Sequence, residues 1–255
     1  MPAFKITVAY DGGPFVGWQR QSRGVSIQGL IEDALKDLDG RDVSVMGAGR
    51  TDAGVHALGQ VASFTLTRDD LTPDVIVRSL NAKLPHEIRV ASAERARASF
   101  NARFDAKHKT YRYRLWTDNV LNPFERAYAW HVFGALDVGA MAAAARLVEG
   151  RHDFAAFQSD GDGRPTERLI TASAFSSNGQ GLATYDVTGN GFLRHMVRAI
   201  VGTLVDIGRG RRPPESMRDV IASRDRAQAG PNAPAQGLFL VGVDYGVVQF
   251  DPHVP

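Results

Sequence analysis

Residues 47–64 read GAGRTDAGVHALGQVASF, a glycine-rich loop that leads into an apolar segment. Glycines before and after Arg50 and Asp52 constrain this loop, and such a loop can present a carboxylate with little conformational freedom. A dinucleotide-binding fingerprint would need glycine in place of Asp52 and a helix directly afterwards, so a Rossmann interpretation is excluded. The alternative to a functional loop is a glycine-rich turn with a surface Arg–Asp pair, which would contribute little to stability.

The loop lies between two predicted strands, and further predicted elements flank them. Ser26 is the expected N-cap of a helix that ends at Gly40, and Thr72, followed by proline, opens a second helix. The predicted elements are a strand at 4–10, a helix at 26–40, strands at 43–46 and 61–66, a helix at 72–82 and a strand at 88–93. Their order is β-α-β-β-α-β.

The second half of the chain repeats that order. We expect strands at 109–116, 169–175, 182–187 and 238–245, and helices at 137–148, 192–207 and 215–223. Two β-α-β-β-α-β units predict an α+β fold of two ferredoxin-like halves, residues 1–105 and 106–255. A cleft between two abutting sheets is a common place for a site.

The composition narrows the class of protein. Of 255 residues, 44% are hydrophobic and 23% charged, as in ordinary globular proteins. Cysteine is absent, which excludes disulfides, thiolate-ligated metals and a thiol nucleophile. No signal peptide and no membrane-spanning run is predicted, so we expect a cytoplasmic protein with no membrane partner. Arginine outnumbers lysine by 25 to 5, which suits phosphate binding but also fits a GC-rich genome.

Basic and aromatic residues alternate between positions 95 and 114. This pattern suits a phosphate backbone and unstacked bases. In a strand, however, Tyr111 and Tyr113 share one face while Arg112 and Arg114 share the other. A structural role, with buried tyrosines and solvated charges, therefore stays open beside the functional one.

A third motif, GFLRHMVR at 191–198, places Arg194 and Arg198 on one face of a predicted helix. Arg198 stands in the more apolar stretch, and a partly buried arginine needs a carboxylate partner. Asp52 is one candidate. No metal or cofactor site is predicted: the seven histidines are scattered, and the DGDG stretch at 160–163 lacks the remaining ligands of a calcium loop.

Together these motifs resemble the bacterial tRNA pseudouridine(38–40) synthase family. The stretch 47–64 is similar to that family's catalytic loop almost letter for letter. The supporting blocks, in the expected order, are YDG at 10–12, FVGWQR at 15–20, SIQG at 26–29, SFNARFDAKHKTYRY at 99–113, GFLRHMVRAIVG at 191–202 and the segment 237–245. Glu167 departs from the small apolar residue usual in the family.

The resemblance implies isomerisation of uridine to pseudouridine in the tRNA anticodon stem-loop, at positions 38, 39 and 40, without a cofactor or metal. It implies that Asp52 is the catalytic carboxylate, that Arg198 pairs with it, and that Tyr111 stacks on uracil. Arg50 would occupy the space vacated by the flipped base. Attack on the base, attack on C1′ and a glycal intermediate remain open. The family further implies an extended mixed or antiparallel sheet with helices on one side, and a homodimer.

Two other functions are consistent with parts of the sequence. A non-catalytic RNA-binding module would bind tRNA regardless of Asp52. A carboxylate-dependent nucleosidase would hydrolyse the same glycosidic bond and release uracil, but no second, paired carboxylate is apparent near Asp52 in the sequence.

Overall fold

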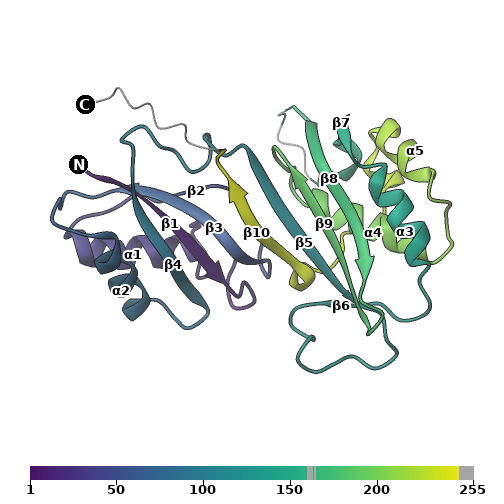
Figure 1. Ribbon diagram of the computed structural model, residues 1–255, viewed down its shortest axis with the longest axis horizontal. Helices are drawn as coiled ribbons and strands as arrows, with labels where there is room; N and C mark the ends of the chain where they lie inside the picture. The colour runs from purple at the N-terminus through teal and green to yellow at the C-terminus, as the bar shows by residue number, and fades with distance from the viewer. Residues whose placement is uncertain (160–162, 164, 247–255) are drawn as a thin grey trace.

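The N-terminal part of the chain forms strands and helices in the predicted β-α-β-β-α-β order in the computed structural model, which describes residues 1–159, 163 and 165–246 (Figure 1). The Ser26 hydroxyl accepts a hydrogen bond from the Gly29 N–H at the start of the first helix, which ends at Gly40 with a φ of 78°. Both predicted helix ends are confirmed. The elements are β1 (Ala3–Tyr10), α1 (Ile27–Asp39), β2 (Met46–Gly47), β3 (His56–Thr65), α2 (Pro73–Lys83) and β4 (Ile88–Ala96).

The C-terminal part contains the predicted elements and two short strands that were not predicted. The elements are β5 (His108–Trp116), β6 (Trp130–His131), α3 (Val138–Arg146), β7 (Gly150–Asp153), β8 (Glu167–Ser177), β9 (Leu182–Gly189), α4 (Met196–Gly208), α5 (Ser216–Ser223) and β10 (Leu238–Asp244). β6 and β7 were missed because they are only two and four residues long. Glu167 is exposed at the start of β8.

All strands belong to one mixed sheet. Its order is β4-β1-β3-β10-β5-β9-β8-β7, with β2 paired to β3 and β6 paired to β5. In the N-terminal part the first strand lies between the fourth and the third, and the second strand pairs with the third. The C-terminal strands β5, β8, β9 and β10 repeat that arrangement. The sheet spans the long axis of the molecule, with α1 and α2 at one end and α3, α4 and α5 at the other (Figure 1).

β10 joins the two parts of the sheet. It runs antiparallel to β5 over most of its length and parallel to β3 through two pairs, Phe239 with His56 and Leu240 with Ala57. β3 begins immediately after the glycine-rich loop. The pairing therefore brings that loop beside β5, although the two are far apart in the sequence.

The predicted strand at 43–46 is wrong for most of its length, because only Met46 and Gly47 pair with β3. Side chains of α1 replace a neighbouring strand: the Val45 N–H donates to Glu32 Oε1, and the Val45 carbonyl accepts from Gln28 Nε2. Because these side chains satisfy the backbone N–H and carbonyl of Val45, this residue does not need to pair with a neighbouring strand.

Two other boundaries differ from the prediction by four residues or more. β3 begins at His56 rather than at residue 61, since its first residues pair with β10. The helix expected from residue 192 begins at Met196, because His195 has a left-handed φ of 62° and cannot continue a right-handed helix. Neither cause is visible in the local sequence pattern.

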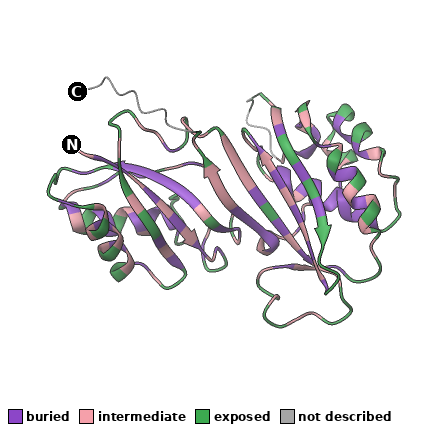
Figure 2. Cartoon of the chain, viewed as in Figure 1, coloured by how far each residue is buried: buried purple, intermediate pink, exposed green. Residues whose placement is uncertain are grey.

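Buried residues lie on both the strands and the helices (Figure 2), and the core packs the two against each other. Phe4, Ile6, Val8 and Tyr10 alternate along β1 and are buried, as a half-buried strand requires. A single buried cluster includes these residues, the inner faces of the helices and the apolar residues of β5 and β9. Within the described residues, no helix is long and apolar enough to cross a membrane.

Candidate active site

The glycine-rich loop between β2 and β3 is clamped by the segment that follows β1. The Trp18 N–H donates to the Thr51 carbonyl oxygen at 3.0 Å, and Gly17 forms an isolated antiparallel bridge with Asp52. A Cβ on Gly17 would lie 2.6 Å from the Thr51 carbonyl oxygen, and one on Gly47 would lie 2.5 Å from the Trp18 indole. Both positions therefore need glycine so that the two segments can approach each other.

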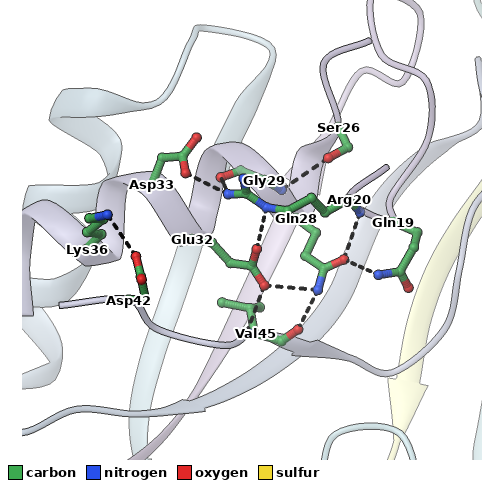
Figure 3. Close-up of polar contacts among 10 residues, drawn as sticks. All are labelled: Gln19, Arg20, Ser26, Gln28, Gly29, Glu32, Asp33, Lys36, Asp42 and Val45. Atoms are coloured by element: carbon green, nitrogen blue, oxygen red, sulfur yellow. Dashed lines mark hydrogen bonds and ion pairs between the residues drawn. The ribbon is translucent and has the colours of Figure 1, made fainter. Parts of the chain in front are cut away.

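A polar network beneath this clamp ties it to α1 (Figure 3). Gln28 Nε2 donates to the Val45 carbonyl at 2.9 Å and to Glu32 Oε1 at 3.0 Å. Gln28 Oε1 accepts from the Arg20 N–H at 2.9 Å, and the Arg20 guanidinium donates to Glu32 Oε2 at 2.7 Å. The segment before the glycine-rich loop and the segment that clamps the loop are thus held by the same two side chains of α1.

Two buried side chains support the loop from below. Tyr10 Oη and Thr51 Oγ1 lie 2.8 Å apart, and Gln60 Nε2 donates to the Gly49 carbonyl at 2.8 Å. Burial raises the pKa of the Tyr10 phenol, so it stays protonated and can donate a hydrogen bond. Gly49 and Thr51 are fixed on either side of Arg50, and this limits the positions open to Asp52.

The Asp52 carboxylate projects from the loop towards the start of α4, with its side chain 37% exposed. Asp52 Oδ2 lies 3.8 Å from Arg198 Nη1 and 3.4 Å from His195 Nε2. Arg198 is held in turn by its Nε donating to the Ala233 carbonyl at 2.7 Å. The structure thus brings together the aspartate and the arginine that the sequence suggested as partners.

Tyr111 stands on β5 close to Asp52, with only 7% of its surface exposed. Its ring packs edge-on against Phe192 at a centroid distance of 5.0 Å. Burial raises the pKa of the Tyr111 phenol, and the neighbouring Tyr10 and the charge of Asp52 raise it further. The phenol is therefore a hydrogen-bond donor and not a phenolate at neutral pH. Its hydroxyl has no hydrogen-bond partner among the described residues.

Arg50 is exposed on the same loop and forms no ion pair with any described residue. The alternative of a surface pair between Arg50 and Asp52 is therefore wrong, because the partners of Asp52 are Arg198 and His195. Arg50 is therefore a solvent-exposed cation on the loop that carries Asp52.

His195 was not predicted from the sequence as a site residue. It stands at the N-cap of α4 in a left-handed conformation, which aims its ring at Asp52. Non-glycine residues with positive φ are uncommon and cluster at functional sites. The signal that could have found His195 is its position three residues before Arg198, at the start of the same helix.

The described residues contain no group of three His, Asp or Glu side chains that could hold a metal ion. Most of the DGDG stretch at 160–163, which the sequence argument rejected as a calcium loop, lies outside the described residues. The side chains close to Asp52 are those of His195, Arg198 and Tyr111.

Comparison with known proteins gives consistent matches. The family model described as "tRNA pseudouridine synthase" matches residues 6–105 and 144–246. The chain is 46% identical to tRNA pseudouridine synthase A of Moorella thermoacetica over 248 residues, which cover 96% of this chain and 100% of that protein. It is 44% identical to tRNA pseudouridine synthase A of Solibacter usitatus, with the same coverage. Among solved structures, DyPB from Rhodococcus jostii RHA1 gives a TM-score of only 0.23 at 11% identity, with 83% of this chain and 85% of that chain covered. That score is too low to indicate a shared fold.

Proposed function

The chain belongs to the tRNA pseudouridine synthase family, and from this membership we propose that it converts uridine to pseudouridine at positions 38, 39 and 40 of the tRNA anticodon stem-loop. The N1–C1′ bond breaks, the uracil turns, and a C5–C1′ bond forms. N1 gains a proton and C5 loses one, so the reaction consumes no redox equivalent. The observation that carries the proposal is the single carboxylate of Asp52, held beside Arg198 and under a buried tyrosine.

Each candidate residue has a role that its surroundings support. Asp52 is the catalytic carboxylate, and the guanidinium of Arg198 lies 3.8 Å from it, where its positive charge faces the reacting group. Tyr111 stacks on the flipped uracil and offers a protonated hydroxyl to it. The exposed guanidinium of Arg50 occupies the gap that the base leaves in the stem, which offsets part of the few kcal/mol that flipping costs.

We also propose a fold for the chain, a cellular compartment and binding partners. Residues 1–105 and 106–255 are two ferredoxin-like halves, supported by the shared strand order β4-β1-β3-β2 and β10-β5-β9-β8. The single cluster that joins buried strand faces to all the α-helices supports helices on one side of the sheet. The enzyme acts in the cytoplasm as a homodimer, which presents a basic surface to the anticodon stem-loop.

The test is tritium release from unmodified tRNA labelled at uridine C5. Asp52→Ala and Asp52→Asn are expected to lower release by at least roughly 10³-fold, because a positioned catalytic group is removed. Their affinity for tRNA should stay close to that of the wild type. Asp42→Ala is the matched control, since that carboxylate is 90% exposed on the surface and should be dispensable.

The outcomes separate the three functions. Release by the wild type without free uracil supports the isomerase, and retained turnover in Asp52→Ala contradicts the role of that residue. Free uracil would indicate a nucleosidase. Tight tRNA binding with no release by the wild type would indicate an RNA-binding module.

A further inference from the structure

Lys109 lies beside the site, and the proposed reaction gives it no role. It is two residues before Tyr111 on β5, so both side chains project from the same face of the strand. A Cβ built on Gly49 would lie 3.6 Å from Lys109 Cε and 3.7 Å from Tyr111 Oη. The lysine stem and the tyrosine hydroxyl therefore approach the same point on the backbone of the catalytic loop.

The ammonium group of Lys109 lacks a counter-charge. It is half-buried, yet it forms no ion pair and no side-chain hydrogen bond within the part of the chain that the structure describes. Lys107, two residues earlier, is exposed. The remaining lysines all form ion pairs: Lys5 with Glu94, Lys36 with Asp42 and Lys83 with Asp37.

Two arginines, Arg103 and Arg168, lie close enough to Lys109 to act on its charge. Burial lowers its pKa, and the positive charges of Arg103 and Arg168 lower it further. Arg103 is exposed, and its guanidinium packs over the exposed ring of Phe104. Cations gathered around a half-buried ammonium group destabilise the free protein. The arrangement becomes favourable when an anion binds among them.

The substrate of the proposed reaction supplies such an anion. A nucleotide that flips out of a stem rotates about its flanking phosphodiesters, which stay at the mouth of the pocket. Two residues along a strand span about 7 Å. This is comparable to the span between a uracil ring and the phosphate of the same nucleotide. With uracil on Tyr111, a flanking phosphate can reach the lysine.

We propose that Lys109 binds a phosphodiester next to the flipped uridine, with Arg103 adding positive charge at the rim of the same site. The contact positions the nucleotide and takes no part in bond making. It rests on the proposed function, because it needs an RNA substrate at Asp52. Lys109→Met keeps the length of the side chain and removes the charge, whereas Lys109→Arg keeps the charge.

The test pairs these variants with tRNA in which one phosphate at a time, on either side of the target uridine, is replaced by an uncharged methylphosphonate. The wild type and Lys109→Arg should bind one of the two substituted tRNAs roughly tenfold more weakly than the all-phosphate tRNA, as expected for the loss of one charge-assisted hydrogen bond. Lys109→Met should bind both substituted tRNAs as it binds the all-phosphate tRNA. Its plot of log affinity against log salt should be shallower by about one unit.

Lys107→Met is the matched control, because it removes an exposed charge from the same segment. It should keep the full discrimination between the tRNAs. The proposal is overturned if Lys109→Met discriminates as strongly as the wild type, or if Lys107→Met loses discrimination equally. Thermal unfolding checks folding, and Lys109→Met should be at least as stable as the wild type because a repulsion is relieved. A wild type that binds tRNA but forms no pseudouridine would contradict the proposed function instead.

Discussion

The two parts of the chain contribute differently to the site. The N-terminal part supplies the carboxylate of Asp52 on a loop whose backbone is bonded on both sides, by the segment at Gly17 and Trp18 and by buried side chains beneath. The C-terminal part supplies Arg198, which lies 3.8 Å from the carboxylate. The N-terminal part fixes the position of the carboxylate. The C-terminal part supplies a positive charge 3.8 Å away from it.

This difference predicts which substitutions lower turnover and which lower the free energy of unfolding. Changes to Arg198 and Tyr111 in the C-terminal part should lower turnover with little effect on stability, because in the proposed reaction these two side chains act at the substrate. Changes in the network beneath the loop should lower the free energy of unfolding first. Among the described residues, the strands of the two parts pair with each other only where β10 meets β3.

The largest effect expected in the C-terminal part is that of Arg198→Met. Without the guanidinium, Asp52 loses its permanent positive partner, and we expect kcat to fall by roughly 10²-fold or more. The free energy of unfolding should fall by only about 1 kcal/mol, for the lost hydrogen bond to Ala233. Single-turnover kinetics and urea denaturation measure the two quantities. Arg224→Met is the matched control at an exposed position. An equal loss of activity in this variant would show that the effect is not specific to Arg198.

Tyr111→Phe should also lower turnover, by roughly 10²-fold, if the hydroxyl serves the substrate. That hydroxyl has no hydrogen-bond partner among the described residues, so its removal should leave the free energy of unfolding unchanged or raise it. Kinetics and thermal unfolding of the same preparation test both. Near-normal activity would show that the aromatic ring alone matters.

In the N-terminal part, Gln28→Ala is the corresponding change. It leaves the Val45 carbonyl and the Arg20 N–H without their partner, and we expect a loss of about 2 kcal/mol in the free energy of unfolding. Turnover should fall by only about tenfold, through looser placement of the loop. Asp33→Ala is the control from the same network, because its side chain is 67% exposed and its ion pair with Arg20 should contribute little.

The smallest effect on activity is expected for Asp39→Asn, at the end of α1. Although burial alone would raise the pKa of Asp39, the Arg41 guanidinium and the hydrogen bonds from Thr67 lower it to about 2. The ionised form therefore stabilises the fold above about pH 4, and this contribution is lost as the pH falls through about 2.

Asp39→Asn should accordingly cost about 1–2 kcal/mol at pH 7 and almost nothing near pH 2. Turnover at pH 7 should not change. Urea denaturation over a pH series measures the dependence. A cost that stays constant down to pH 2 would contradict the assignment to the carboxylate charge.

Local signals in the sequence predicted the helices well. Ser26, Gly40 and Thr72 act on their immediate neighbours, so the helix ends could be located without tertiary information. The segment at Val45 could not, because its backbone partners are side chains of a helix that precedes it by many residues. The start of β3 was likewise set by β10, a strand far away in sequence.

The residues of the candidate site that lie in sequence motifs could be predicted. Asp52, Tyr111 and Arg198 were named from their motifs, and the structure brings them together. His195 was missed because its proximity to Asp52 depends on a backbone conformation that residue type does not reveal. The charge of Lys109 was missed for a related reason, since only the folded chain shows that no described acidic side chain forms an ion pair with it.

The position of β10 also sets the order in which the protein can mature during synthesis. The strands β1, β3 and β4 can pair as soon as they leave the ribosome, but the edge of β3 that receives β10 stays open until residues 238–244 emerge. During that interval the nascent chain presents an unpaired edge, which can template pairing with other chains. The Asp52 carboxylate and Arg198 therefore reach their final arrangement only after nearly all of the described chain has been made, so an interrupted translation product carries the glycine-rich loop without the strand that pairs beside it.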